Sequence, residues 1–223
     1  MEPCEKEQQT SPAAGQEPGG DEERGHFFSD LMDIAEAGVL TVFIFLLVFI
    51  FLIRRVTVDG GSMNPTLIDK DQILILMSLY EPKNGQIVVL DDKVSAVFWD
   101  EEQTQVAEKD GSDMVLVKRL IAKGGQTIDI DASQGTVKVD GVLLDEPYIA
   151  DPTTVDDGAF HYPMTVPEGY IFVMGDNRLY SMDSRSPHVA LIPESEILGT
   201  ALLRYDRDKD LRTKWTERFD FLF

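Results

Sequence analysis

The chain has 223 residues, of which 40 are acidic and 20 are basic, so its formal net charge at pH 7 is -20. A surface that binds phosphate backbones needs the opposite charge balance, and the composition therefore excludes nucleic acid as a leading partner. The single cysteine, Cys4, excludes an intrachain disulfide, and the three widely separated histidines show no zinc-ligand spacing, so we expect no metal site.

The N-terminal part of the chain is read as a tail and an anchor. Residues 1–33 are rich in Glu, Gln, Pro, Gly and Ser, a composition typical of a disordered acidic tail. We assign residues 34–55 to a transmembrane helix, because residues 37–53 carry no charge and are apolar on all sides. A cleaved secretory signal is the rival reading, but the preceding region is acidic and Arg54 and Arg55 follow in place of a small-residue cleavage site. The sequence therefore predicts a permanent anchor.

Beyond the anchor, short β-type runs alternate with turn residues. We expect residues 56–223 to form a mainly β domain of twisted antiparallel sheets, closed or partly open like a barrel. Residues 131–135 predict a hairpin loop and Asp140 with Gly141 a tight turn. Two acidic stretches, 91–113 and 151–161, lack a core pattern and are expected to be variable surface loops. The predicted strands are 56–58, 72–77, 86–90, 114–122, 127–130, 136–139, 170–174 and 197–203.

Ser62 lies in the stretch GGSMNPTL, residues 60–67, just beyond the anchor. The glycines leave no large neighbour before the serine, and Pro65 restricts Asn64 to an extended backbone. Such a stretch can hold one hydroxyl in an exposed, fixed place. An ordinary Gly-Ser-Asn-Pro turn has the same composition, so both interpretations stay open here.

Lys118 interrupts an otherwise apolar strand face. In a strand over residues 114–122, Lys118 lies on the same face as Leu116 and Leu120, and Arg119 points to the other side. Burial lowers the pKa of a lysine and can make it a neutral base near pH 7. The alternative is that Lys118 extends its ammonium to solvent at the strand edge.

A dense polar stretch, GDNRLYSMDSR at residues 175–185, follows the apolar run 170–174. It can be a loop whose polar groups satisfy one another, or part of a site. A serine hydroxyl needs a base to become a nucleophile, and no histidine–aspartate pair has a suitable context, so a neutral lysine is the candidate. Ser62, Lys118 and Ser181 together predict a serine-lysine hydrolase.

These three stretches, in this order and after an anchor, resemble the conserved boxes of bacterial-type type I signal peptidases. These are membrane-bound serine peptidases that remove signal peptides from exported preproteins. Residues 62–67 resemble the nucleophile box, residues 117–121 the lysine box and residues 175–185 the third box, while residues 145–148 (DEPY) stand in the expected interval. The resemblance covers about residues 56–204. It implies a signal-peptidase fold, an acyl-transfer mechanism that needs no cofactor, and cleavage after small residues, in the pattern Ala-X-Ala.

The resemblance implies a role for each matching residue. Ser62 matches the nucleophile, whose backbone N–H also holds the oxyanion, and Lys118 matches the general base. Ser181 matches the serine that hydrogen-bonds and orients this lysine. The other supporting residues are Gly175, Asp176, Asn177, Asp183 and Arg185, of which the last two match an ion pair.

The chain departs from the family pattern at two places. Some members carry a hydroxyl two residues before the nucleophile to hold the oxyanion; here Gly60 stands there, so backbone groups or water must replace it. Residues 123–126, KGGQ, replace the Pro-Gly-Asp with which the lysine box of the family usually ends.

The family's small substrate residues imply shallow apolar pockets, and we expect their walls to include Met63, Ile73, Ile75 and Met77.

The implied partners are the signal peptides of secreted preproteins, membrane lipid and, by proximity, the protein export machinery; we expect a monomer.

The orientation of the anchor has two conflicting signals. Two basic residues, Arg54 and Arg55, lie on the C-terminal side of the anchor and one, Arg24, on its N-terminal side, which by the positive-inside rule favours a cytoplasmic C-terminal domain. The family topology instead places the N-terminus in the cytoplasm and the catalytic domain on the extracytoplasmic side of the cell membrane, with a single pass. We adopt it, because long domains translocate largely regardless of charge.

Two alternative functions are compatible with parts of the sequence. A repressor-type self-cleaving serine-lysine protein needs a DNA-binding module where this chain has a tail and an anchor. A non-catalytic anchored β-domain that binds peptides requires Ser62 and Lys118 to have no catalytic role.

The aromatic residues of the C-terminal segment 215–223 predict a final core or edge strand, with contact to the bilayer as the alternative.

Overall fold

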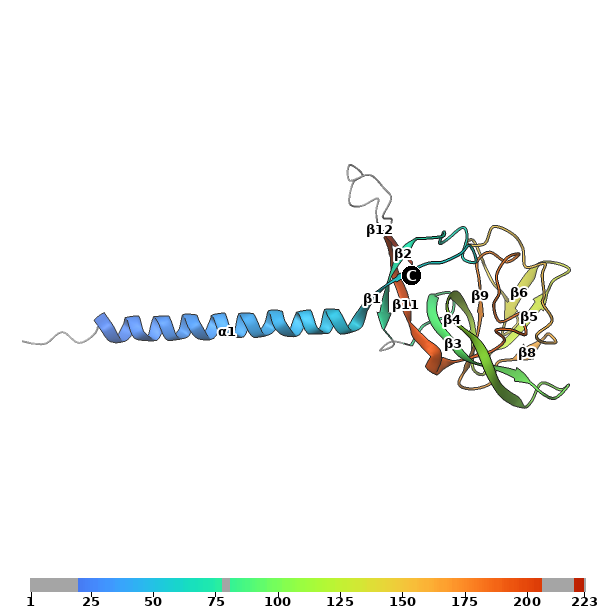
Figure 1. Ribbon diagram of the computed structural model, residues 1–223, viewed down its shortest axis with the longest axis horizontal. Helices are drawn as coiled ribbons and strands as arrows, with labels where there is room; N and C mark the ends of the chain where they lie inside the picture. Colours follow the sequence, from blue (N-terminus) through green and yellow to red (C-terminus); the bar gives the residue numbers. More distant parts are fainter. Residues whose placement is uncertain (1–19, 78–80, 206–218, 223) are drawn as a thin grey trace, which may run out of the picture. The chain divides into compact units, whose positions relative to one another are not determined.

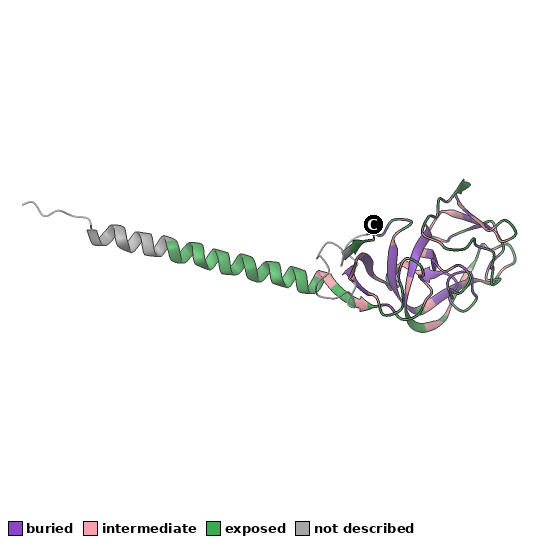
Figure 2. Cartoon of the chain, turned by 90° about the horizontal axis from the view of Figure 1, so that it is seen from above, coloured by how far each residue is buried: buried purple, intermediate pink, exposed green. Residues whose placement is uncertain are grey.

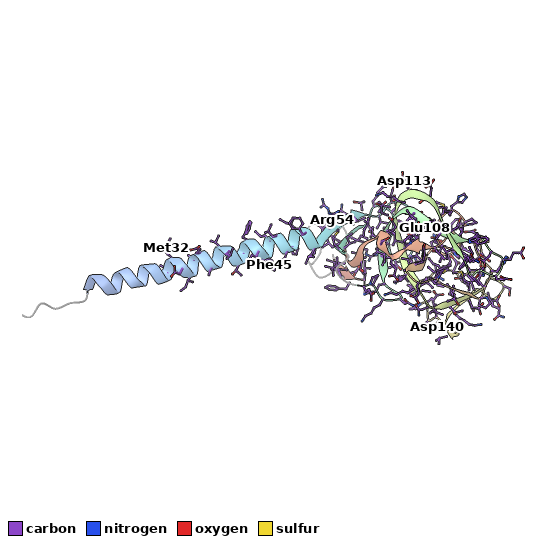
Figure 3. All side chains as sticks on the ribbon, turned by 90° about the horizontal axis from the view of Figure 1, so that it is seen from below. Met32, Phe45, Arg54, Glu108, Asp113 and Asp140 are labelled. Carbon is purple, nitrogen blue, oxygen red and sulfur yellow. The ribbon has the colours of Figure 1, made fainter. Side chains whose placement is uncertain are left out.

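The computed structural model describes residues 20–77, 81–205 and 219–222. It divides into two units, residues 1–48 and residues 49–223. Helix α1 (Gly20–Leu52) contains a segment, Leu31–Leu52, that is long and apolar enough to cross a membrane. The side chains of this segment are exposed almost throughout (Figure 2), and those of Met32 and Phe45 are seen projecting from it in Figure 3.

The predicted boundaries of the anchor need correction at both ends. Residues 20–33, expected to be disordered, are helical, because extending an existing helix costs far less than starting one. The helix ends at Leu52 and not at residue 55, since the next residues pair with strand β2. The rest of the predicted tail, residues 1–19, lies outside the described residues.

The second unit is mainly β, as predicted, and every strand pair in it is antiparallel (Figure 1). Its larger sheet has the order β1-β2-β11-β3-β4-β9-β10, with β12 paired to β11, and its smaller sheet has the order β7-β6-β5-β8. The elements are β1 (Ile53–Thr57), β2 (Gln72–Met77), β3 (Ile87–Phe98), β4 (Val106–Lys123), β5 (Thr127–Asp131), β6 (Thr136–Val139), β7 (Val142–Leu143), β8 (Met164–Thr165), β9 (Tyr170–Met174), β10 (Ile192–Pro193), the 3-10 helix η1 (Glu194–Glu196), β11 (Ile197–Tyr205) and β12 (Phe219–Phe221).

Several short-range predictions are confirmed. Strands β2, β6 and β9 have the predicted bounds. The predicted hairpin loop connects β5 to β6. Asp140 and Gly141 join β6 to β7 with positive φ angles of 52° and 77°, the combination that a tight two-residue hairpin turn requires.

The prediction of a surface loop over residues 91–113 is wrong. Strands β3 and β4 continue through this stretch and pair as one long hairpin. Near the bulge in this hairpin, the buried carboxylate of Asp92 accepts hydrogen bonds from the hydroxyls of Ser95 and Ser112, at 2.7 Å and 2.5 Å. A hydrogen-bonded aspartate therefore takes the place of an apolar core residue. Because it interrupts the apolar pattern, the strand could not be recognised from the sequence.

The second expected surface loop, residues 151–161, contributes a side chain to the core. Residues 151–161 contain no helix or strand, as predicted, but Phe160 is buried in the core, with its ring centroid 5.8 Å from that of Phe98.

Of the C-terminal segment 215–223, residues 219–221 form strand β12 beside β11, as expected for a final strand. Residues 215–218 and 223 lie outside the described part of the chain.

The core below the Ser62 stretch is a compact apolar cluster. Met63 and Leu67 are fully buried in it. They pack with side chains from β2 and β3, and Val58, before the serine, belongs to the same cluster, so the chain is held against the larger sheet both before and after Ser62. The members of the cluster are Val58, Met63, Leu67, Ile73, Ile75, Ile87, Val89 and Ala201.

Candidate active site

Ser62 lies in the connection between β1 and β2 and is half-buried. Gly60, two residues before it, has a φ angle of +92°, a backbone conformation that favours glycine. The N–H of Gly60 donates to the Asp69 carboxylate at 2.8 Å, and the N–H of Leu67 donates to the Met63 carbonyl at 2.9 Å. These bonds close the connection into a fixed turn with the serine at its bend.

Lys118 reaches Ser62 from the middle of β4. Its side chain lies on the strand face that carries Leu116 and Leu120, and the residue is only 4% exposed. Lys118 Nζ lies 2.8 Å from Ser62 Oγ. Burial lowers the pKa of Lys118 to about 8, against the opposing field of Asp183. About a tenth of this amine is therefore neutral at pH 7, and about half at pH 8.

The peptide group between Gly61 and Ser62 is held in one orientation. The carbonyl of Gly61 accepts hydrogen bonds from Asn177 Nδ2 at 3.0 Å and from the N–H of Asn64 at 3.2 Å. The carbonyl of Ser62 accepts a third bond from the N–H of Asn177, also at 3.0 Å. In a trans peptide the N–H points away from the carbonyl. The Ser62 N–H is thereby directed away from these donors, and it makes no hydrogen bond to any described residue.

Ser181 lies beside this arrangement but is not bonded to it. Its side chain and the carbonyl of Ser62 both approach the same face of Gly175. Ser181 is buried, and its hydroxyl makes no hydrogen bond among the described residues. The expected hydrogen bond from Ser181 to Lys118 is absent from this structure, and the orienting role of Ser181 stays a prediction.

Asp183 and Arg185 form an ion pair with both side chains fully buried. Arg185 Nη2 lies 2.9 Å from Asp183 Oδ2, which also accepts the N–H of Gly175 at 2.9 Å. Arg185 donates in addition to the carbonyl of Arg178 at 2.8 Å. The pair thus fixes the backbone on both sides of the loop that carries Ser181.

A second buried ion pair joins all three sequence stretches. Two of the three side-chain nitrogens of Arg119, Nε and Nη2, donate to the carboxylate of Asp176, at 2.8 Å and 2.5 Å. The same carboxylate accepts the hydroxyl of Thr66 at 2.5 Å. The residue after the lysine, the third stretch and the serine turn are therefore connected side chain to side chain. Asp176 was among the predicted supporting residues, but the parts played by Arg119 and Thr66 were missed.

Tyr148, from the DEPY stretch, packs against the same group of residues. Its ring lies 3.8 Å from the Arg119 guanidinium carbon, and its hydroxyl bonds Glu146 at 3.0 Å. Glu146 in turn pairs with the buried Arg178 at 2.6 Å. The stretch was recognised only by its place in the sequence. The arginines that approach the ring of Tyr148, Arg119 and Arg178, are far from it in the sequence, so no local pattern indicated this packing.

The four expected pocket-wall residues are placed mostly in the core. Met63, Ile73 and Ile75 are at most 1% exposed, and Met77 is half-buried at the end of β2. Their contact with a substrate stays a prediction. Within the described ranges, no three His, Cys, Asp or Glu side chains gather in a group that could hold a metal ion.

Comparisons with known proteins identify the family of the chain. The family model "Signal peptidase, peptidase S26" matches residues 31–205. The chain is 33% identical over 190 residues to a signal peptidase I of Bacillus amyloliquefaciens (79% of this chain and 86% of the relative), and 33% identical over 179 residues to signal peptidase I T of Bacillus subtilis strain 168 (76% and 82%). It is also similar to the crystal structure of a signal peptidase I from Enterococcus faecalis V583, with 25% identity and a TM-score of 0.40 over 55% of this chain and 98% of that chain.

Proposed function

Because the chain belongs to the S26 family of signal peptidases, we propose that Ser62 and Lys118 are the catalytic dyad of this membrane-anchored serine peptidase. The family makes the chain a hydrolase whose substrates are preproteins that carry signal peptides. The observation that carries the proposal is the 2.8 Å contact between Lys118 Nζ and Ser62 Oγ, made by a lysine whose pKa burial lowers to about 8. A neutral amine at hydrogen-bond distance from a hydroxyl is what a general base requires.

The reaction is an acyl transfer through an acyl-enzyme. Neutral Lys118 accepts the hydroxyl proton of Ser62 while Oγ attacks the carbonyl carbon of the scissile peptide bond. The resulting ammonium gives this proton to the nitrogen of the leaving chain as the carbon–nitrogen bond breaks. A water molecule, deprotonated by the again neutral Lys118, then hydrolyses the ester and returns the Ser62 hydroxyl.

The oxyanion is stabilised by the backbone of the serine itself. The Ser62 N–H is directed by the hydrogen bonds on the Gly61 carbonyl and has no described partner of its own, so it can donate to a developing negative charge. The N–H of Gly60 is occupied by Asp69. A second donor therefore comes from another backbone group or from water.

We place cleavage after small residues in an Ala-X-Ala pattern, on the strength of family membership. Met63, Ile73 and Ile75 supply a rigid apolar floor under the serine turn, and Met77 continues it along β2. A close-packed floor suits short side chains, since a larger one would need the core to open.

The same family membership supports a single pass with the N-terminus in the cytoplasm and the catalytic domain outside, near the export machinery. Lipid surrounds the segment Leu31–Leu52, and the enzyme acts as a monomer. Protease shaving of intact cells tests the orientation. Digestion of the β domain with survival of the N-terminal tail is expected, and loss of the tail with survival of the β domain would overturn it.

The dyad is tested with Ser62→Ala and Lys118→Met in the full-length protein, assayed on a preprotein in detergent. Both variants should lose cleavage by at least about a thousandfold, because each removes one member of an interdependent pair. Lys93→Met is the matched control, since Lys93 is exposed on β3 and pairs only with Asp91 among the described residues. Cleavage by either dyad variant at the wild-type rate contradicts the proposal.

A further inference from the structure

The loop that carries Ser181 has an inverted pattern of exposure. Its polar and charged residues are buried, among them Asp176, Arg178 and Asp183, each at most 1% exposed. Its apolar and aromatic residues face outward instead. Leu179 is 37% exposed, Met182 42% and Tyr180 81%. Exposed apolar side chains gathered in one place indicate a binding surface.

These outward side chains border a pocket of about 470 Å³. Leu179, Tyr180 and Met182 form one part of its wall, and residues 186–188 form another. Asp157, which is exposed and makes no ion pair with any described residue, lies in the same wall. The pocket therefore has apolar side chains in one part of its wall and the exposed carboxylate of Asp157 in another, while Arg178 of the same wall is buried and paired with Glu146.

The pocket reaches toward the proposed dyad through Ser181. Ser181 belongs to its wall, and the Ser181 side chain meets the same face of Gly175 as the carbonyl of Ser62. Lys118 also lies within electrostatic reach of this loop, since Asp183 and Arg185 both act on its pKa. Ser181 therefore connects the pocket to the backbone of Ser62, and its loop contributes to the electrostatic field at Lys118.

We propose that this pocket binds the first residues of the mature chain, on the carboxyl side of the cleaved bond. The inference rests on the proposed function and adds a subsite to it. The leaving nitrogen has to lie next to Lys118 to receive its proton, and the chain that continues from this nitrogen passes over the loop with Ser181. An apolar side chain early in the mature segment packs on Tyr180 and Met182. Asp157 attracts a basic residue and repels an acidic one.

The test compares two substrates of one enzyme in detergent. The first is a preprotein, and the second is its signal peptide joined at the cleavage site to a small chromogenic amine, which has no mature segment. Tyr180→Ala and Met182→Ala should each lower kcat/KM for the preprotein about tenfold and change kcat/KM for the chromogenic substrate less than about twofold. Val142→Ala, an exposed apolar residue on β7 outside this pocket, is the matched control and should change neither.

Charge reversal gives a second, independent readout. Wild-type enzyme should cleave a preprotein with lysine early in its mature segment faster than the same preprotein with glutamate, and Asp157→Lys should reverse this order at low salt. Equal losses on both substrates with the Tyr180 and Met182 variants, or losses seen only in lipid vesicles and not in detergent, would overturn the subsite. A wild-type enzyme that cleaves neither substrate would instead overturn the proposed function.

Discussion

A methyl group placed on Gly175 would lie 2.1 Å from the hydroxyl oxygen of Ser181 and 2.4 Å from the carbonyl oxygen of Ser62. No side chain fits into such a gap without displacing one of these two groups. We therefore expect Gly175→Ala to lower kcat/KM for preprotein cleavage by at least about a hundredfold, since a shift of about 1 Å at the nucleophile has effects of this size.

The control for this substitution is Gly38→Ala, because a methyl group on Gly38 meets nothing within 4 Å. The thermal unfolding of both variants is measured beside their activity, to separate loss of folding from displacement of Ser62. Full activity of Gly175→Ala would show that Ser62 and Ser181 tolerate displacement, which is contrary to our expectation.

The pH dependence of cleavage should follow the protonation of Lys118. Its pKa of about 8 means that about a tenth of the lysine is neutral at pH 7, so kcat/KM should rise with pH and level off above pH 8. The measurement is kcat/KM for the chromogenic signal-peptide substrate from pH 6 to pH 10. A profile that is flat between pH 6 and pH 9 would exclude Lys118 as the base.

Lys118 should also reduce the stability of the protein at neutral pH. Its pKa is about 8 in the folded chain and near its ordinary value of 10.5 in the unfolded chain, so between these values the unfolded state binds more protons. The free energy of unfolding of the wild type therefore increases by up to about 3 kcal/mol as the pH rises from 8 to 10.5. Lys118→Met lacks this gain.

Urea unfolding of wild type and Lys118→Met in detergent, at pH 7 and at pH 10, measures the difference. The stability of the variant relative to the wild type should be greatest at pH 7 and should shrink at pH 10. A relative stability that grows with pH would mean that the folded chain raises the pKa of this lysine.

The pair of Arg119 and Asp176 should be much more important for stability than an exposed ion pair. Asp176→Ala leaves the buried guanidinium of Arg119 without its carboxylate, a change that costs about 3–5 kcal/mol. Asp59→Ala removes the exposed partner of Lys70 and should leave the urea midpoint unchanged. Because Asp176 also accepts the hydroxyl of Thr66, activity should fall in Asp176→Ala even under conditions where the variant is folded.

The two residues of the proposed dyad could be singled out because each one departs from its local pattern. A lysine on an apolar strand face and a serine between glycines and a proline are visible within a few positions of sequence. Their meeting at 2.8 Å required the strands to be placed beside each other, and here the resemblance to a family supplied what local pattern could not.

Other features depended on long-range pairing and remained hidden. Thr66 is 110 positions from Asp176, and nothing in the sequence near either residue indicates the other. The length of the β3–β4 hairpin was missed for a related reason, since the buried Asp92 is stabilised by Ser112, 20 residues away. A polar residue can be recognised as part of a core only when its partner is known.

The three arginines around the dyad are each matched by a carboxylate, in pairs that have side chains at most 7% exposed. The charges nearest to Lys118 therefore cancel inside the protein, and mobile ions have little access to them. Although the whole chain carries a net charge of -20, the pKa of the lysine should shift little between dilute buffer and half-molar sodium chloride. An enzyme built in this way keeps its working pH range when the salt concentration of its surroundings changes.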